Sequence, residues 1–173
     1  MSHFIVAQPE KCIGCHTCEV ACAVGHEGTP LLAARRYFPR LKVVKSAQIS
    51  VPVMCRQCEN APCVTACPVA ALYKGEQAIE MQSQRCINCK SCVIACPFGA
   101  IEIVGEHEEV PLIVKCDLCA GQQEGQACIR VCPTGALTLM TAASLTHQQQ
   151  KQQRAAAESQ LHAHVLEEVE THG

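Results

Sequence analysis

Up to residue 140, the hydrophobic residues of this chain fall into short runs bounded by proline, glycine or charged residues. Runs of four or five apolar and β-branched residues between turn signals are typical of β-strands. We therefore predict strands at residues 4–7, 41–45, 49–53 and 78–81, and a turn followed by a strand after Cys96 and again after Cys132. Residues 23–40 contain glycines and prolines around an apolar stretch, which predicts an irregular excursion with one helical turn.

The pattern changes in residues 141–173, where Gln, Ala, Glu and His dominate. Ser144 is a suitable N-cap, and no proline or glycine follows Leu145 until the last residue, so we predict a C-terminal helical tail. Two roles are open for this tail helix. If it has no partner, it packs on the rest of its own chain or frays in solvent. Alternatively it mediates assembly by docking on a partner subunit or on a second copy of the chain. Its apolar stripe consists of Ala157, Leu161, Val165 and Val169, with Leu166 beside it.

Composition shows that cysteine, and not large apolar side chains, dominates this chain. Of its 173 residues 16 are cysteine, whereas tryptophan is absent and there are only three phenylalanines and two tyrosines. A chain this short and poor in aromatics needs something other than packing to hold it together.

Charge and hydropathy indicate the cellular compartment of the protein and bear on membrane and nucleic-acid binding. Residues 1–10 have neither the basic nor the apolar region of a signal peptide, so we predict a cytoplasmic location, where clustered cysteines more often bind metal than form disulfides. No apolar run is long enough for a direct membrane span. The formal charge of -2 gives no indication of a nucleic-acid surface.

The central cysteine motif has the spacing of an iron-sulfur signature, C-x2-C-x2-C-x3-C-P. Cys92 and Cys96 lie four residues apart, on one face of a helical turn, so one helix can contact two clusters. Pro97 disfavours helical geometry at Cys96 and directs that thiolate away from the other three. The motif therefore needs partner motifs. Its ligand candidates are Cys86, Cys89, Cys92 and Cys96.

Three partner motifs are present, and together they use every remaining cysteine. The repeating unit is a strand, a cysteine loop, a short helix, Cys-Pro and a second strand, although the first copy lacks the proline. Two such units make one two-cluster ferredoxin module, so four units predict an α+β fold of two ferredoxin-like modules, each binding two 4Fe-4S clusters, plus a C-terminal helix. The partner motifs are Cys12, Cys15, Cys18 and Cys22; Cys55, Cys58, Cys63 and Cys67; and Cys116, Cys119, Cys128 and Cys132.

Clustered cysteines can also bind zinc or form disulfides. Zinc sites with four thiolates rarely need a third cysteine two residues further on, and a redirecting proline has no use there. A disulfide framework conflicts with the missing signal peptide. His16 and His26 flank the first motif, but every cluster already has four thiolates, so we interpret them as surface residues or as neighbours of the ligands.

Basic residues stand beside the ligands in several motifs. A cation near a cluster raises its reduction potential, whereas a solvated one merely balances its negative charge. We interpret most of them as solvated charges and keep Lys115 and Arg56 as candidates for tuning. The full set is Arg56, Arg85, Lys90, Lys115 and Arg130.

Short sequence stretches in and around the cysteine motifs indicate a protein family. Five stretches carry the likeness: Phe-Ile-Val-Ala at 4–7, Cys-Ile-Gly-Cys-His-Thr-Cys-Glu-Val-Ala-Cys at 12–22, Pro-Arg-Leu-Lys-Val at 39–43, Cys-Arg-Gln-Cys-Glu-Asn-Ala-Pro-Cys at 55–63 and Val-Lys-Cys-Asp-Leu-Cys at 114–119. On these residues the chain resembles the four-cluster ferredoxin-type electron-transfer subunits of the dimethyl sulfoxide reductase and formate dehydrogenase family. It is most similar to the branch that holds the small iron-sulfur subunit of formate hydrogenlyase. The resemblance covers about residues 3–140.

The resemblance implies that fourth ligands are exchanged between outer motifs and between inner motifs. The outer two-cluster module would consist of residues 1–50 and 111–140, and the inner one of residues 51–110. The implied ligand sets are Cys12, Cys15, Cys18 and Cys132; Cys116, Cys119, Cys128 and Cys22; Cys55, Cys58, Cys63 and Cys96; and Cys86, Cys89, Cys92 and Cys67.

No residue pattern in the chain indicates substrate chemistry, so we predict a non-catalytic electron-transfer subunit of an oxidoreductase complex. The resemblance implies a molybdenum or tungsten formate dehydrogenase-type catalytic subunit as one partner. It implies a hydrogenase or another ferredoxin-type subunit as the other. The alternative is a free-standing polyferredoxin or an accessory protein for maturation of formate dehydrogenase or hydrogenase.

Overall fold

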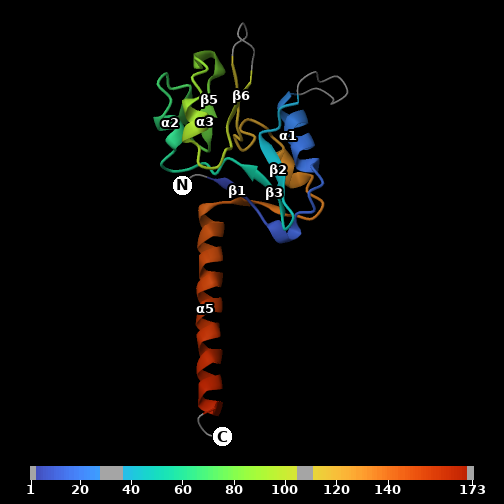
Figure 1. Ribbon diagram of the computed structural model, residues 1–173, viewed down its shortest axis with the longest axis vertical. Coiled ribbons are helices and arrows are strands. Elements are labelled where there is room, and N and C mark those ends of the chain that lie inside the picture. Colours follow the sequence, from blue (N-terminus) through green and yellow to red (C-terminus); the bar gives the residue numbers. More distant parts are fainter. Residues whose placement is uncertain (1–2, 28–36, 105–110, 171–173) are drawn as a thin grey trace. The chain divides into compact units, whose positions relative to one another are not determined.

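The computed structural model describes residues 3–27, 37–104 and 111–170, and it describes side chains in the last helix only as far as residue 160. Over these ranges the chain has a small α+β fold of mostly short elements (Figure 1). The strands are β1 (Phe4–Ala7), β2 (Leu41–Lys45), β3 (Ser50–Met54), β4 (Leu72–Lys74), β5 (Ile79–Met81), β6 (Glu102–Val104), β7 (Leu112–Val114) and β8 (Leu137–Met140). The helices are α1 (Thr17–Glu27), α2 (Pro62–Thr65), α3 (Ser91–Ala95), α4 (Ala127–Arg130) and α5 (Ala142–Glu170), with 3-10 turns η1 (Pro9–Lys11) and η2 (Ser83–Arg85).

The predicted strands are present with small shifts at their ends. β1 and β2 have the predicted bounds, β3 begins and ends one residue later, and β5 begins one residue later. The turn-and-strand pattern after Cys96 and Cys132 gives β6 and β8. The helical turn predicted within residues 23–40 falls largely on residues 28–36, which lie outside the described residues.

Each strand that the structure describes belongs to a two-stranded sheet. The pairs are β1 with β8, β2 with β3, β4 with β5, and β6 with β7. Leu41 lies opposite Met54 in the antiparallel β2-β3 pair, and Leu72 lies opposite Met81 in the antiparallel β4-β5 pair. A two-stranded sheet is only marginally stable alone, so these ribbons need support from the loops and helices that they join.

The core of residues 1–139 consists of small side chains. Eight of the buried apolar residues are cysteines and six are alanines, and none of those in the described ranges is aromatic. They form two clusters. One contains Ile5, Leu41, Met54 and Leu137 with five cysteines, and the other contains Leu72, Ile79, Ile101 and Ile113 with two.

The helices that carry cysteines pack in two pairs, α1 with α4 and α2 with α3. Figure 1 shows α2 and α3 together beside β5, and α1 beside β2. Helix α3 ends because Cys96 precedes Pro97 and adopts an extended conformation, with φ -78° and ψ 112°. Ala23 follows Cys22 where the other motifs have proline, and α1 accordingly continues to Glu27.

Residues 140–173 form a separate unit dominated by α5. The prediction that Ser144 caps this helix is wrong, because Thr141 does so. The Thr141 hydroxyl accepts a hydrogen bond from the Ser144 backbone N–H (3.2 Å), and the Ser144 hydroxyl accepts one from the Thr141 N–H (2.7 Å). This reciprocal capping box starts the helix at Ala142.

The side chains of α5 are mostly exposed as far as residue 160, Ala157 included. The rest of the predicted apolar stripe, Leu161, Val165, Leu166 and Val169, lies outside the described side chains. Among the helices of the described ranges, none combines the length and the hydropathy needed to cross a bilayer.

Candidate metal centres

Each C-x2-C pair bends at the same place. The residue immediately before the second cysteine has a left-handed backbone in all four motifs. This conformation favours glycine, yet only one of the four is glycine. A left-handed residue next to right-handed ones turns successive N–H groups toward one side and forms a concavity suited to anions, iron-sulfur clusters among them. The four residues are Gly14 (φ 64°), Gln57 (φ 49°), Asn88 (φ 58°) and Leu118 (φ 59°).

Backbone N–H groups donate to cysteine sulfur in several of these loops. The N–H of Gln57 donates to Cys55 Sγ and that of Asn88 to Cys86 Sγ, both at 3.4 Å. A donor directed at sulfur favours the thiolate over the thiol. The loops therefore fit a group whose ligands are thiolates.

The segments after the Cys-Pro pairs supply further donors. The third residue after the fourth cysteine is left-handed in three motifs, at Ala70, Gly99 and Gly135. The following N–H groups then turn toward the cysteine, and Ala71 N donates to Cys67 Sγ at 3.2 Å and Ala136 N to Cys132 Sγ at 3.3 Å. The same turn thus recurs at cysteines that are far apart in the sequence.

One small pocket is lined by cysteines that lie far apart in the sequence. Its walls include Cys12, Cys15, Cys18 and Cys132, so the last cysteine of the fourth motif lies beside the first three of the first motif. The side chain of Cys15 is exposed, and the Thr17 hydroxyl donates to its sulfur at 3.3 Å.

Electrostatic neighbours reveal the surroundings of the remaining cysteines. Burial, and after it the thiols of Cys55 and Cys96, raise the pKa of Cys58. Burial, followed by Cys67 and Cys86, raises the pKa of Cys92 to about 11.

The fourth motif has the same kind of neighbour. Burial, and then Cys116 and Cys22, raise the pKa of Cys128. In each case the last cysteine of one motif lies close to cysteines of another.

Buried thiols at these sites do not ionise easily without a positive partner. Burial is the largest cause that raises the pKa of Cys18 to about 11 and that of Cys116 to about 12. Bound metal supplies the missing positive charge and displaces the protons. In the described ranges no three Cys, His, Asp or Glu side chains converge closely enough for a single metal ion.

A network of hydrogen bonds and ion pairs connects the fourth motif to α1 and to Arg40, the residue before β2. Both ring nitrogens of His26 donate, Nδ1 to the Cys22 carbonyl at 2.7 Å and Nε2 to Asp117 Oδ1 at 3.0 Å. Asp117 also accepts from the Arg40 guanidinium and from Cys119 N–H at 3.0 Å. Against the effect of burial, the hydrogen bond to Asp117 raises the pKa of His26 to about 12, and His26 and Arg40 lower that of Asp117 to about 2. His26 therefore lies among the neighbours of the ligands, as interpreted from the sequence.

Two residues of these sites escaped the sequence analysis. Asp117 lies between Cys116 and Cys119. Its acidic side chain within a cysteine motif is the only sequence signal for its role as a hydrogen-bond acceptor. Gln57 is 2% exposed, and nothing in its sequence context marks it as a buried hydrogen-bonding residue.

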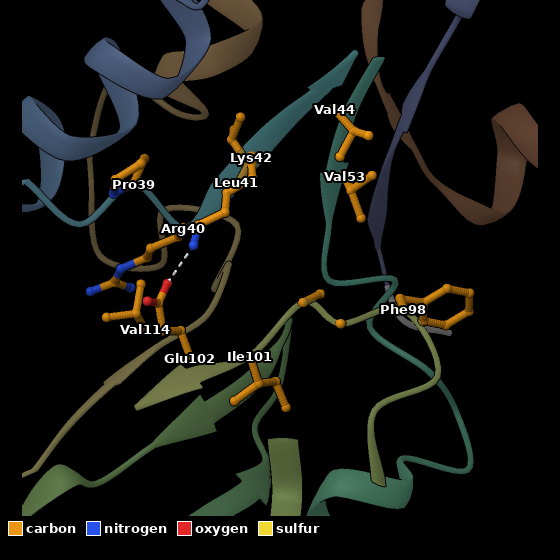
Figure 2. Close-up of a pocket in the computed structure, with 12 residues that line it drawn as sticks. Pro39, Arg40, Leu41, Lys42, Val44, Val53, Phe98, Ile101, Glu102 and Val114 are labelled. Carbon is orange, nitrogen blue, oxygen red and sulfur yellow. Dashed lines mark hydrogen bonds and ion pairs between the residues drawn. The ribbon is translucent and has the colours of Figure 1, made fainter. Parts of the chain in front are cut away.

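A pocket without cysteines lies between the β2-β3 hairpin and the segment before β6 (Figure 2). Its volume is about 350 Å³, and Leu41, Val53, Phe98 and Ile101 are among its lining residues. An exposed ion pair between Lys42 and Glu102 (2.8 Å) crosses its rim. The titratable groups that line this pocket, Arg40, Lys42 and Glu102, are all engaged in ion pairs, so the chemistry of the chain lies with the cysteines.

Comparison with protein families agrees with the cysteine geometry. Residues 47–142 match a 4Fe-4S dicluster domain, and residues 9–25 match a 4Fe-4S binding domain. The chain belongs to the family of 4Fe-4S ferredoxin-type electron-transfer proteins. Its cofactors are therefore 4Fe-4S clusters, as predicted from the motif spacing.

Relatives of this ferredoxin-type chain occur in Escherichia coli strain K12. It is 43% identical to the putative electron transport protein YsaA over 88% of its own length and 99% of that protein. It is 37% identical to hydrogenase-4 component A, over 91% of each chain. It is also 37% identical to formate hydrogenlyase subunit 2, over 81% of its own length and 82% of that protein.

Other relatives are much longer, and the chain spans only 21% and 23% of the length of two putative oxidoreductases that it matches. The full-length relatives carry names of electron transport proteins or of components of redox complexes. These names agree with the 4Fe-4S electron-transfer family to which the chain belongs.

Proposed function

We propose that the chain holds four 4Fe-4S clusters, each by three cysteines of one motif and the last cysteine of another. The observation that carries this proposal is the pocket that Cys132 shares with Cys12, Cys15 and Cys18. The neighbours of Cys58, Cys92 and Cys128 support the same exchange elsewhere. When bound, each cluster accepts and releases one electron.

The four sets then occupy two modules. Residues 1–50 and 111–140 form the outer module, supported by the packing of α1 on α4 and of β1 on β8. Residues 51–110 form the inner module, supported by the packing of α2 on α3.

The helices support an order of these sets. Helix α1 carries Cys18 and Cys22, which belong to the two outer sets, and Cys92 and Cys96 at α3 belong to the two inner sets. Cys116 has Cys55 among its electrostatic neighbours, so an outer set and an inner set meet there.

The two ends of this series reach the surface. Cys15 and Cys89 are exposed, and each lies in a loop with an exposed isoleucine, Ile13 (66% exposed) or Ile87 (61% exposed). The other two sets, which contain Cys55 and Cys116 and which we call the middle sets, consist mostly of buried cysteines. We infer that electrons enter and leave at these exposed loops and that the chain itself performs no substrate chemistry.

For the partners, we propose a molybdenum or tungsten formate dehydrogenase-type catalytic subunit at one end and a hydrogenase or another ferredoxin-type subunit at the other. The names of formate hydrogenlyase subunit 2 and hydrogenase-4 component A support this assignment. It places the chain within the dimethyl sulfoxide reductase and formate dehydrogenase group. A reducing compartment such as the cytoplasm suits sixteen free thiols.

Chemical analysis of the anaerobically purified protein tests the cluster proposal. We expect on the order of sixteen iron and sixteen sulfide per chain, because four complete cysteine sets each support one cubane. About four zinc per chain without sulfide would contradict it. Identification of the subunits that co-purify tests the partners, and a chain that purifies alone with all its iron would favour a free-standing polyferredoxin or a maturation protein.

Truncation after Met140 tests the assembly role of the tail. We expect the shortened chain to keep its full iron content and to lose its partner or change its oligomeric size, because α5 is mostly exposed in its described part and contains no cysteine. Iron analysis with size-exclusion chromatography measures both. Unchanged assembly would show that the tail has no docking role.

A further inference from the structure

Lys115 is the one charged side chain that is buried among the described residues, with 0% of its surface exposed. Removing an ammonium group from water is costly unless opposite charge or hydrogen bonds compensate for the lost hydration. A lysine in this position therefore needs a source of negative charge nearby.

The Lys115 ammonium contacts a backbone carbonyl. Its Nζ donates to the Cys116 carbonyl oxygen at 2.7 Å. In the ranges that the structure covers, no Asp or Glu forms an ion pair with it. One carbonyl dipole does not neutralise a full charge, so the compensating negative charge comes from another kind of group.

Gln57, the other buried polar side chain of the described residues, meets Lys115 at the same carbonyl. Its Nε2 donates to the Cys116 oxygen at 2.8 Å, and its Oε1 accepts from Ile79 N–H at 2.8 Å. Its own N–H donates to Cys55 Sγ. Lys115 thus lies at a junction that joins a cysteine of the second motif to a cysteine of the fourth.

The thiols on both sides of the junction respond to the Lys115 charge. The Lys115 ammonium is an electrostatic neighbour of both Cys63 and Cys116. These two cysteines belong to different ligand sets in the proposed function.

We propose that Lys115 provides the countercharge shared by the two middle ligand sets and raises the reduction potential of both clusters that they hold. These sets are Cys55, Cys58, Cys63 and Cys96, and Cys116, Cys119, Cys128 and Cys22. The inference rests on the proposed function, from which it takes the sets.

The direction of the effect follows from charge. Reduction adds one negative charge to a group that four thiolates already make anionic, and a fixed cation stabilises the more negative state. The effect is strong because water is excluded around Lys115, whereas solvent screens charges near the exposed Cys15 and Cys89.

The test is an anaerobic redox titration of the purified holoprotein, followed by electron paramagnetic resonance, with iron counted in every sample. Lys115→Met removes the charge and the donor, Lys115→Gln removes the charge and keeps a donor, and Lys115→Arg keeps the charge. Lys90→Met is the matched control, because Lys90 is an exposed lysine directly after the ligand Cys89.

We expect Lys115→Gln and Lys115→Met to lower two of the four midpoint potentials. The reduction equilibrium of each affected cluster should fall about tenfold or more, and a tenfold change equals about 59 mV for a one-electron couple. Lys115→Arg and Lys90→Met should leave all four potentials near those of the wild type.

Each other outcome is decisive. If both neutral variants lose iron while Lys115→Arg retains it, the charge is still required as the countercharge of the clusters. Full iron with unchanged potentials in Lys115→Gln would overturn the inference while leaving the proposed function intact. Loss of iron in the arginine variant as well would assign Lys115 to packing alone, and wild-type protein without iron and sulfide would refute the proposed function instead.

Discussion

Anaerobic removal of iron from the folded protein is expected to unfold residues 1–139. The strands there pair only in twos, and the buried apolar residues are mostly cysteine and alanine, so hydrophobic burial contributes little. Structural metal sites contribute on the order of 10 kcal/mol to folding, and whole domains are stable by only about 5–15 kcal/mol. Loss of several clusters therefore exceeds the stability that the remaining contacts supply.

Circular dichroism and limited proteolysis during chelation measure this unfolding. Restoring iron and sulfide under reducing conditions is the control, since refolding then shows that the chain itself was undamaged. An iron-free protein that keeps native-like secondary structure and unfolds cooperatively on heating would contradict the prediction.

Replacing Cys96 by serine is expected to damage the cluster held by Cys55, Cys58 and Cys63 and to spare the one held by Cys86, Cys89 and Cys92. The reason is geometric. Pro97 forces Cys96 out of the helix, and Cys96 is an electrostatic neighbour of both Cys58 and Cys63. Up to about a quarter of the iron should be lost, since one of four cubanes loses a ligand.

Pairs of variants make this experiment specific. Cys96→Ser should give the same spectroscopic change as Cys58→Ser, because both alter one ligand set. Cys67→Ser should match Cys89→Ser, since Cys67 is a neighbour of Cys92 in the other set. Resonance spectra that instead pair Cys96→Ser with Cys89→Ser would refute the exchange of fourth ligands.

The sequence predicted the chemistry well because cysteine spacing acts locally. The step of two residues between cysteines and the proline after the fourth one constrain a few neighbouring dihedral angles, and Cys96 adopts the extended geometry that Pro97 demands. The four strands whose bounds were predicted, β1, β2, β3 and β5, agree with the structure to within a residue for the same reason, since turn residues mark their ends.

Local rules were less successful where two residues compete for the same role. Thr141 and Ser144 are both good capping residues, and sequence alone favoured Ser144 beside the first large apolar residue of the tail. In the structure their hydroxyls and N–H groups satisfy each other, which places the start of the helix at Ala142.

The sequence by itself thus determined the cofactor class, the repeating unit and the ligand candidates, because these depend on residues that lie near one another along the chain. Tertiary structure decided which distant groups meet. Only the folded chain brings Asp117 to His26 and Arg40, and Gln57 to the Cys116 carbonyl. Burial of Lys115 was likewise decided by the fold, since its charge alone predicts a solvated side chain and only the surrounding packing removes the water.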